Sequence, residues 1–162
     1  SATGHSLVKA RLRETGAPFA GEMSGHLFFN DGRWPGFDDG LYAAARLLEI
    51  VSRSDNPSAV LDALPTAVNT PELHIEFSKE GENKAFIEKL RQAAKFDDAE
   101  DVILIDGLRV EFKDGFALAR SSNTTPVAVI RVEGDTPEAL ERIKERFAVF
   151  ILSVDPTVKL PF

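Results

Sequence analysis

Apolar and polar residues follow their clearest pattern in the second half of the chain. Leu73, Ile75 and Phe77 alternate with polar residues, which predicts a half-buried strand. Helical spacing predicts one helix around residues 86–94 and another that begins after Thr136. Short apolar runs between turn residues predict four further strands, over 102–105, 108–112, 116–120 and 127–132. This order of elements predicts an antiparallel sheet of four to five strands with helices packed on one face.

The first part of the chain carries shorter patterns. Apolar spacing predicts helices over His5–Thr15 and Gly40–Val51, a strand over Leu27–Phe29 and a short helix over 57–64. The helix over Gly40–Val51 has apolar residues on several sides, so we expect it to be well buried. We interpret the whole chain as an α+β protein, in which a partial mixed α/β domain precedes the antiparallel sheet.

A domain boundary is expected between Leu64 and Thr70, after the short helix that Pro65 ends. We place it so that residues 1–67 form the first domain and residues 68–162 the second. The second domain has a full set of elements and is expected to fold alone. The first lacks neighbouring strands, so we expect it to expose apolar surface and an unpaired sheet edge.

Composition excludes several functions. Lys and Arg number 19 against 26 Asp and Glu, a net charge of −7 that disfavours binding to a free polyanion such as a nucleic acid. No apolar run approaches the ~20 residues that cross a bilayer, so no membrane partner is expected. The absence of Cys excludes thiol nucleophiles and zinc–thiolate sites. The chain begins with Ser1 and its single methionine is Met23, so we expect a processed or cut piece.

A metal site is not expected in this chain. With three His residues and no Cys, such a site would need mostly carboxylates. The closest acidic pair, Asp38 and Asp39, precedes the helix over Gly40–Val51 and is interpreted as the start of that helix.

Two loops are candidates for chemistry, and we number them in chain order. The second loop, residues 120–126, has the sequence Arg-Ser-Ser-Asn-Thr-Thr-Pro. Its small hydroxyl and amide residues offer hydrogen-bond donors, and its backbone N–H groups could curl around an anion. Arg120 adds a permanent charge and a planar fork that matches phosphate oxygens. A polar surface hairpin with an incidental Arg explains the same composition, and composition alone favours that interpretation slightly.

The other candidate is the first loop, residues 21–26, with the sequence Gly-Glu-Met-Ser-Gly-His. The two carboxylate oxygens of Glu22 can accept hydrogen bonds from neighbouring hydroxyls, and Ser24 and His26 lie on the same loop. Together they suit a polyol such as a sugar ring. The alternative is a glycine turn whose Glu is solvated, and the loop by itself does not decide between the two.

Both loops, in this order, resemble the motifs of the α-D-phosphohexomutases, most closely the bacterial phosphomannomutase/phosphoglucomutase branch. The resemblance extends over essentially the whole chain, including residues 3–7 (Thr-Gly-His-Ser-Leu) and 36–40 (Gly-Phe-Asp-Asp-Gly). It implies that residues 1–67 are the end of the sugar-binding domain 3 and residues 68–162 the phosphate-binding C-terminal domain 4. Phosphoglucosamine mutases are the nearest rival, but usually carry Gln where Met23 stands.

The resemblance also implies which residues bind the ligand. The sugar would be held by His5, Glu22, Ser24 and His26. The phosphate would be held by Arg120, Ser122, Asn123 and Thr124. No catalytic residue is expected in this chain, although His26 is a candidate for an auxiliary part in proton movement.

The activity implied is that of an isomerase, which interconverts hexose 1-phosphate and hexose 6-phosphate through a 1,6-bisphosphate. Intact family members carry a phosphoserine and an Asp-Gly-Asp-Gly-Asp-Arg loop for Mg²⁺, and neither motif occurs here. We therefore expect a C-terminal third that is inactive alone. Its implied partners are glucose and mannose phosphates and the N-terminal domains of the same enzyme. The resemblance also implies that glucose 1,6-bisphosphate is the activator and that the enzyme is cytoplasmic. Its products would be precursors of exopolysaccharides.

Two other functions remain open at this point. A free-standing phosphosugar-binding module would bind glucose 1-phosphate without turnover. A purely structural or interaction domain would be unaffected by Arg120→Ala.

Overall fold

The computed structural model describes residues 3–162. The described chain divides into two compact units, one that ends at Pro65 and one that spans Thr66–Phe162. Each unit has its own cluster of buried hydrophobic side chains. We call them unit 1 and unit 2.

Unit 2 is built on a six-stranded antiparallel sheet. Its strands are β3 (Val68–Asn69), β4 (Leu73–Glu76), β5 (Asp101–Ile103), β6 (Leu108–Phe112), β7 (Gly115–Ser121) and β8 (Val127–Gly134). They lie in the order β3-β8-β7-β6-β5, and β4 also pairs with β8. The predicted fold class is confirmed. The sixth strand is β3, whose two residues are too few to produce an alternating pattern.

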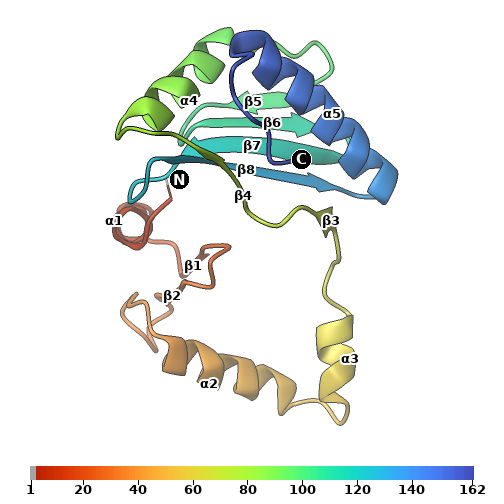
Figure 1. The fold of residues 1–162 in the computed structure, drawn as a ribbon. Coiled ribbons are helices and arrows are strands. Elements are labelled where there is room, and N and C mark those ends of the chain that lie inside the picture. The colour runs from red at the N-terminus through yellow and green to blue at the C-terminus, as the bar shows by residue number, and fades with distance from the viewer. Residues whose placement is uncertain (1–2) are drawn as a thin grey trace. The chain divides into compact units, whose positions relative to one another are not determined.

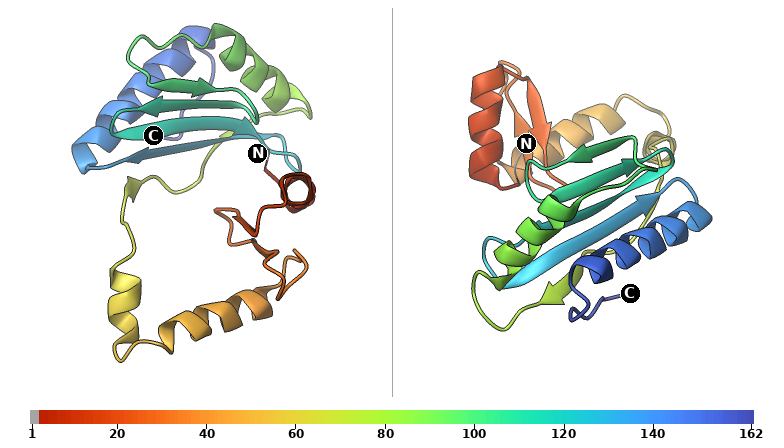
Figure 2. Two further views of the ribbon diagram at one scale, coloured as in Figure 1. Left: turned by 180° about the vertical axis from the view of Figure 1, so that it is seen from behind. Right: turned by 90° about the horizontal axis from the view of Figure 1, so that it is seen from above.

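Two helices, α4 (Glu82–Ala93) and α5 (Pro137–Val154), cover one face of this sheet (Figures 1 and 2). Alternate residues of the strands point toward the helices, as in β6, where Leu108, Val110 and Phe112 are buried. From α5, Ile143 and Phe147 are fully buried against them. Helix α5 begins as predicted, because the Thr136 hydroxyl accepts a hydrogen bond from the Ala139 N–H at 3.2 Å.

Glycine is required at one tight turn of the sheet. Gly107, in the turn between β5 and β6, has a φ of +113°. A Cβ atom there would lie 2.3 Å from the carbonyl oxygen of Ala119. Any other residue would therefore separate β6 from β7 at this end of the sheet.

Unit 1 contains three helices and a two-stranded hairpin. Its elements are α1 (His5–Thr15), β1 (Phe19–Gly21), β2 (Leu27–Phe29), α2 (Gly40–Val51) and α3 (Pro57–Asp62). Its buried cluster consists of Val8, Leu12 and Phe28. The sequence patterns identified all of these elements except β1, whose three residues follow Pro18 and show no alternation that could be recognised.

Helix α2 forms where predicted, but the expectation that it is well buried is wrong. None of its residues is buried, and Leu41 and Leu48 are 86% and 64% exposed. Tyr42 stacks on Trp34 with ring centroids 4.2 Å apart and meets Phe29 of β2 edge-on at 5.6 Å, but these contacts bury no residue of the helix. Unit 1 therefore exposes apolar surface, as predicted.

No helix within residues 3–162 has the length and apolar character needed to cross a bilayer.

Candidate functional site

The first loop connects the two strands of the unit 1 hairpin. The Gly25 N–H donates to the carbonyl of Glu22 at 3.0 Å, and the Glu22 N–H donates to the carbonyl of His26 at 2.9 Å. Gly25 has a φ of +89°, a conformation that favours glycine. The turn residues thus hold Glu22 and His26 at the two ends of the loop, and Ser24 is exposed at its tip.

Glu22 is tied to the start of α1. Its Oε1 accepts a hydrogen bond from the N–H of Gly4, the N-cap residue of that helix, at 2.8 Å. A carboxylate at a helix N-terminus is stabilised by the unpaired N–H groups and the helix dipole. Glu22, which is predicted to bind the sugar, is thereby held by a backbone group, and its second oxygen, Oε2, can accept a hydrogen bond from another donor.

His26 is held by a residue that the sequence interpretation assigned to the helix start. The Nδ1 atom of His26 lies 2.7 Å from Oδ2 of Asp38. Asp39, the neighbouring residue, does cap α2, because its Oδ1 accepts from the Tyr42 N–H at 2.9 Å. The two adjacent carboxylates therefore have different partners, and only Asp39 has the predicted one.

The structure brings together three of the four residues predicted to bind the sugar. The rings of His5 and His26 lie 6.4 Å apart, and Glu22 is bonded to the residue that precedes His5. Asp38 belongs to the same group although the sequence analysis did not include it. A histidine and a carboxylate separated by a strand and a turn give no pattern, so only the fold could reveal this pair.

The second loop connects β7 to β8 in unit 2. Its turn is fixed from within by the Ser122 hydroxyl, whose Oγ accepts from the N–H groups of Thr124 at 3.3 Å and Thr125 at 3.2 Å. The Ser122 N–H donates to the carbonyl of Val127 at 2.9 Å. Asn123 and Thr124 are exposed at the tip.

Arg120 precedes this loop on β7. Ala117 and Ala119 are buried beneath the helices, so the alternation of the strand directs Arg120 to the opposite face of the sheet. Among residues 3–162, its guanidinium has no hydrogen bond or ion pair. Its charge is therefore available to an anion at the edge of the loop.

One residue that the sequence analysis missed fixes the second loop from below. Asn83, in the first turn of α4, is only 2% exposed. Its Nδ2 donates to two loop carbonyls, of Ser122 at 3.1 Å and Thr125 at 3.3 Å, and to the carbonyl of Val127, the first residue of β8, at 3.1 Å. Asn83 stands three, four and seven residues before Phe86, Ile87 and Leu90. A polar residue on the apolar face of a predicted helix was the available signal.

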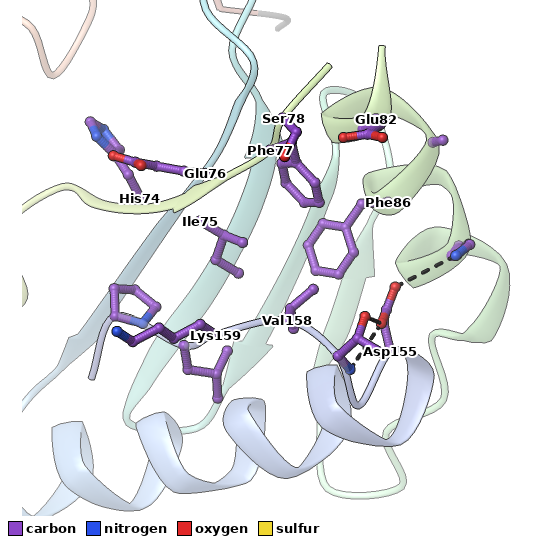
Figure 3. Close-up of a pocket in the computed structure, with 15 residues that line it drawn as sticks. His74, Ile75, Glu76, Phe77, Ser78, Glu82, Phe86, Asp155, Val158 and Lys159 are labelled. Atoms are coloured by element: carbon purple, nitrogen blue, oxygen red, sulfur yellow. Dashed lines mark hydrogen bonds and ion pairs between the residues drawn. The ribbon is translucent and has the colours of Figure 1, made fainter. Parts of the chain in front are cut away.

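A separate cavity of about 730 Å³ lies in unit 2 between β4, α4 and the segment after α5 (Figure 3). Phe77 and Phe86 form an apolar wall, with ring centroids 5.3 Å apart. On another side of the cavity, Oδ2 of Asp155 lies 3.5 Å from Nζ of Lys89. None of the residues predicted to bind phosphate lines this cavity.

Magnesium does not fit the residues described. Asp38 is paired with His26 and Asp39 caps the start of α2, and residues 3–162 contain no group of three potential metal ligands. No step of the chemistry is derived through a metal on this chain.

Comparison with known proteins follows the division into two units. Residues 1–68 match the family model "Phosphoglucomutase/phosphomannomutase, alpha/beta/alpha domain III", and residues 76–149 match the model of the C-terminal domain of the same family. The fold and these two matches define a protein built from mutase domains. The chain belongs to the phosphoglucomutase/phosphomannomutase family.

The chain is similar to proteins named phosphoglucomutase and, at lower identity, to one named phosphoglucosamine mutase. A phosphoglucomutase of Neisseria gonorrhoeae is 58% identical over 151 residues, which cover 93% of this chain and 33% of that protein. A phosphomannomutase/phosphoglucomutase of Pseudomonas aeruginosa is 48% identical over 161 residues, 99% of this chain and 34% of that protein. A probable phosphoglucosamine mutase of Thermococcus gammatolerans is 31% identical over 143 residues, 88% of this chain and 31% of that protein.

A solved structure also matches. The crystal structure of a family member from Burkholderia thailandensis is 60% identical and gives a TM-score of 0.90, covering 99% of this chain and 33% of that one. The chain thus spans about a third of the length of the relatives it matches.

Proposed function

We propose that this chain supplies the sugar- and phosphate-binding part of an enzyme that interconverts hexose 1-phosphate and hexose 6-phosphate. The observation that carries the proposal is the pair of loops on two mutase-type domains, one presenting Glu22 and His26 and the other presenting Arg120. Phosphoglucosamine mutase is the weaker alternative, because the relative of that name is 31% identical whereas the phosphoglucomutase is 58% identical.

In this proposal the second loop binds the phosphate that is not being transferred. Arg120 contributes its charge, and Ser122, Asn123 and Thr124 contribute hydroxyl, amide and backbone donors. The site must accept the phosphate at either end of the sugar. A loop that recognises the charged group alone meets this requirement, because that group is the same in both orientations of the bisphosphate.

The first loop binds the sugar ring in the same proposal. Glu22 and Ser24 would hold the O3 and O4 hydroxyls, through the free Oε2 of Glu22 and the exposed hydroxyl of Ser24. Glucose and mannose differ only at C2, so contacts at O3 and O4 accept both. His5 and His26 would border the ligand. With Nδ1 of His26 facing Asp38 at 2.7 Å, its Nε2 is the nitrogen available to the ligand.

The chemistry of phosphoryl transfer belongs to other domains of the enzyme. There Mg²⁺ would neutralise charge on the transferred group, and a phosphoserine would exchange it with the sugar through the 1,6-bisphosphate. The division into domain 3 (1–67) and domain 4 (68–162) is part of this proposal. The bisphosphate activator, the cytoplasmic location and the supply of exopolysaccharide precursors are further parts, supported by the family resemblance.

A chimera tests the proposal. Residues 1–162 would replace the matching third of the 58% identical relative from Neisseria gonorrhoeae. We expect the chimera to convert glucose 1-phosphate with Mg²⁺ and glucose 1,6-bisphosphate, and Arg120→Ala to reduce kcat/KM at least tenfold. The 162-residue chain alone should show no turnover.

Two results would contradict the proposal. One is a folded chimera without activity. The other is an Arg120→Ala chimera with unchanged kcat/KM, which is the outcome expected of a purely structural domain. Binding of glucose 1-phosphate by the 162-residue chain would not separate the enzyme part from a free-standing binding module, whereas turnover by the chimera would.

A further inference from the structure

Buried polar side chains usually have their hydrogen bonds satisfied, and Asn83 satisfies its own in an unusual way. Its single amide group donates to two carbonyls of the second loop and to the first carbonyl of β8, at 3.1 to 3.3 Å. The two N–H groups of the amide have three acceptors, so one N–H is shared between two carbonyls. The loop carbonyls therefore converge on a single point beneath the loop, at the first turn of α4.

This convergence decides which way the loop's peptide groups face. In a trans peptide, the C=O of one residue and the N–H of the next point in opposite directions. The Ser122 carbonyl points toward Asn83, so the Asn123 N–H points away from α4. The Thr125 carbonyl precedes Pro126, which has no N–H. The N–H that follows the Val127 carbonyl belongs to Ala128, a strand residue that is paired with Ile75 of β4.

The backbone N–H of Asn123 differs from those of its neighbours in the loop. The N–H groups of Thr124, Thr125 and Val127 each donate to an acceptor within the loop, and that of Ser122 donates to the carbonyl of Val127 at the start of β8. Within residues 3–162, the Asn123 N–H has no hydrogen-bond partner. Three carbonyl oxygens, which would repel an anion, are meanwhile turned away from it and neutralised by Asn83.

We propose that Asn83 is a positioning residue of the phosphate site, which turns the Asn123 N–H outward to the anion by holding the Ser122 carbonyl inward. This inference rests on the function proposed above. Asn83 does not touch the phosphate itself, and it acts through the orientation of one peptide group.

The test uses the 162-residue chain labelled with ¹⁵N, titrated with inorganic phosphate and with glucose 1-phosphate. In the wild type, the Asn123 amide should show the largest shift of the loop amides. Asn83→Ala and the isosteric Asn83→Asp, which lacks the amide donor, should each weaken the Kd for inorganic phosphate about tenfold, the loss of one hydrogen bond to a charged group.

Phe86→Leu is the matched control, since Phe86 is buried in the same helix at 2% exposure and has no hydrogen bond to the loop. It should lower the midpoint of thermal unfolding and leave the Kd within twofold of the wild type. If wild type binds phosphate and both Asn83 variants bind it equally well, the inference is wrong. A shift at Thr124 and Thr125 without one at Asn123 would also overturn it. A wild-type chain that binds neither ligand would instead contradict the phosphate site as a whole.

Discussion

Helices form at the predicted positions in both units, but the two units bury very different numbers of side chains. Eighteen side chains form the buried cluster of unit 2, between a sheet and two helices, whereas unit 1 buries three. Helix α2 is as clearly helical as α5, yet none of its residues is buried. Apolar periodicity therefore predicts a helix with an apolar face, whereas the burial of that face depends on a second layer that packs against it.

The two candidate loops reflect the same difference. The second loop is fixed to a buried core through Asn83, which is 2% exposed. The first loop is fixed at the surface, by the bond from Gly4 to Glu22 and by the His26–Asp38 pair. We therefore expect the phosphate site to be rigid and the sugar site to be more easily displaced.

The largest expected effect comes from truncating matched side chains in the two units. Phe147 is fully buried in α5, so Phe147→Ala should cost about 3–5 kcal/mol of unfolding free energy. Leu48 is 64% exposed in α2, and Leu48→Ala should cost less than about 0.5 kcal/mol. Urea unfolding followed by circular dichroism measures both. A cost at Leu48 equal to that at Phe147 would remove the contrast between the units.

Hydrogen exchange should sharpen the contrast without mutation. Amides of β6, β7 and α5 should exchange only on global unfolding of unit 2, while those of α2 should exchange through local opening. A chain of residues 66–162 alone should retain the protection pattern of unit 2. Slower exchange in α2 than in α5, or a disordered 66–162 chain, would contradict the account.

The neighbouring carboxylates at the start of α2 separate ligand binding from stability within unit 1. In the chimera, Asp38→Asn should reduce kcat/KM about tenfold, because a neutral amide holds the imidazole of His26 less strongly than a carboxylate. Asp39→Ala should instead lower stability by about 1 kcal/mol through the lost cap. Equal effects of the two variants on kcat/KM would show that Asp38, like Asp39, is purely structural.

The smallest effect on stability is expected from the protonation of single carboxylates at low pH. The hydrogen bond from Arg46 lowers the pKa of Asp31 in unit 1 below its ordinary value of 3.8. The hydroxyl of Thr157, with its backbone N–H, lowers the pKa of Asp155 in unit 2 in the same way. A lowered pKa in the folded state adds stability above pH 3.8, and that contribution is lost as the pH falls through the folded-state pKa.

Asp155→Asn should therefore flatten the dependence of the unfolding midpoint on pH below about pH 4. The matched variant in unit 1, Asp31→Asn, should flatten the same pH dependence when unfolding is followed by a probe located in unit 1. An unchanged slope in both variants would show that neither carboxylate contributes.

Much of this fold could be predicted from the sequence, because its strands and helices carry the period of their own structure. The turn residues and the cap at Thr136 marked boundaries correctly. Strand β3 was missed because two residues do not establish a period, and β1, which is as short as the predicted strand β2, was missed because it directly follows Pro18 and shows no alternation. The burial of α2 was predicted wrongly because periodicity describes a face and not its cover.

The candidate site was predicted in part for a related reason. Its loops are continuous in sequence and could be recognised as motifs. Asp38 and Asn83 act across 12 and 39 residues of chain to hold those loops, and such partners become visible only when the fold brings them together.

Two ligands compared on two variants of the 162-residue chain would show whether one loop binds the sugar and the other the phosphate. Calorimetric titration would measure the Kd of inorganic phosphate and of glucose 1-phosphate for Arg120→Ala and Glu22→Gln. We predict that Arg120→Ala weakens both ligands at least tenfold, and that Glu22→Gln weakens glucose 1-phosphate alone. If Glu22→Gln weakens both ligands equally, or Arg120→Ala weakens neither, this division of roles is wrong.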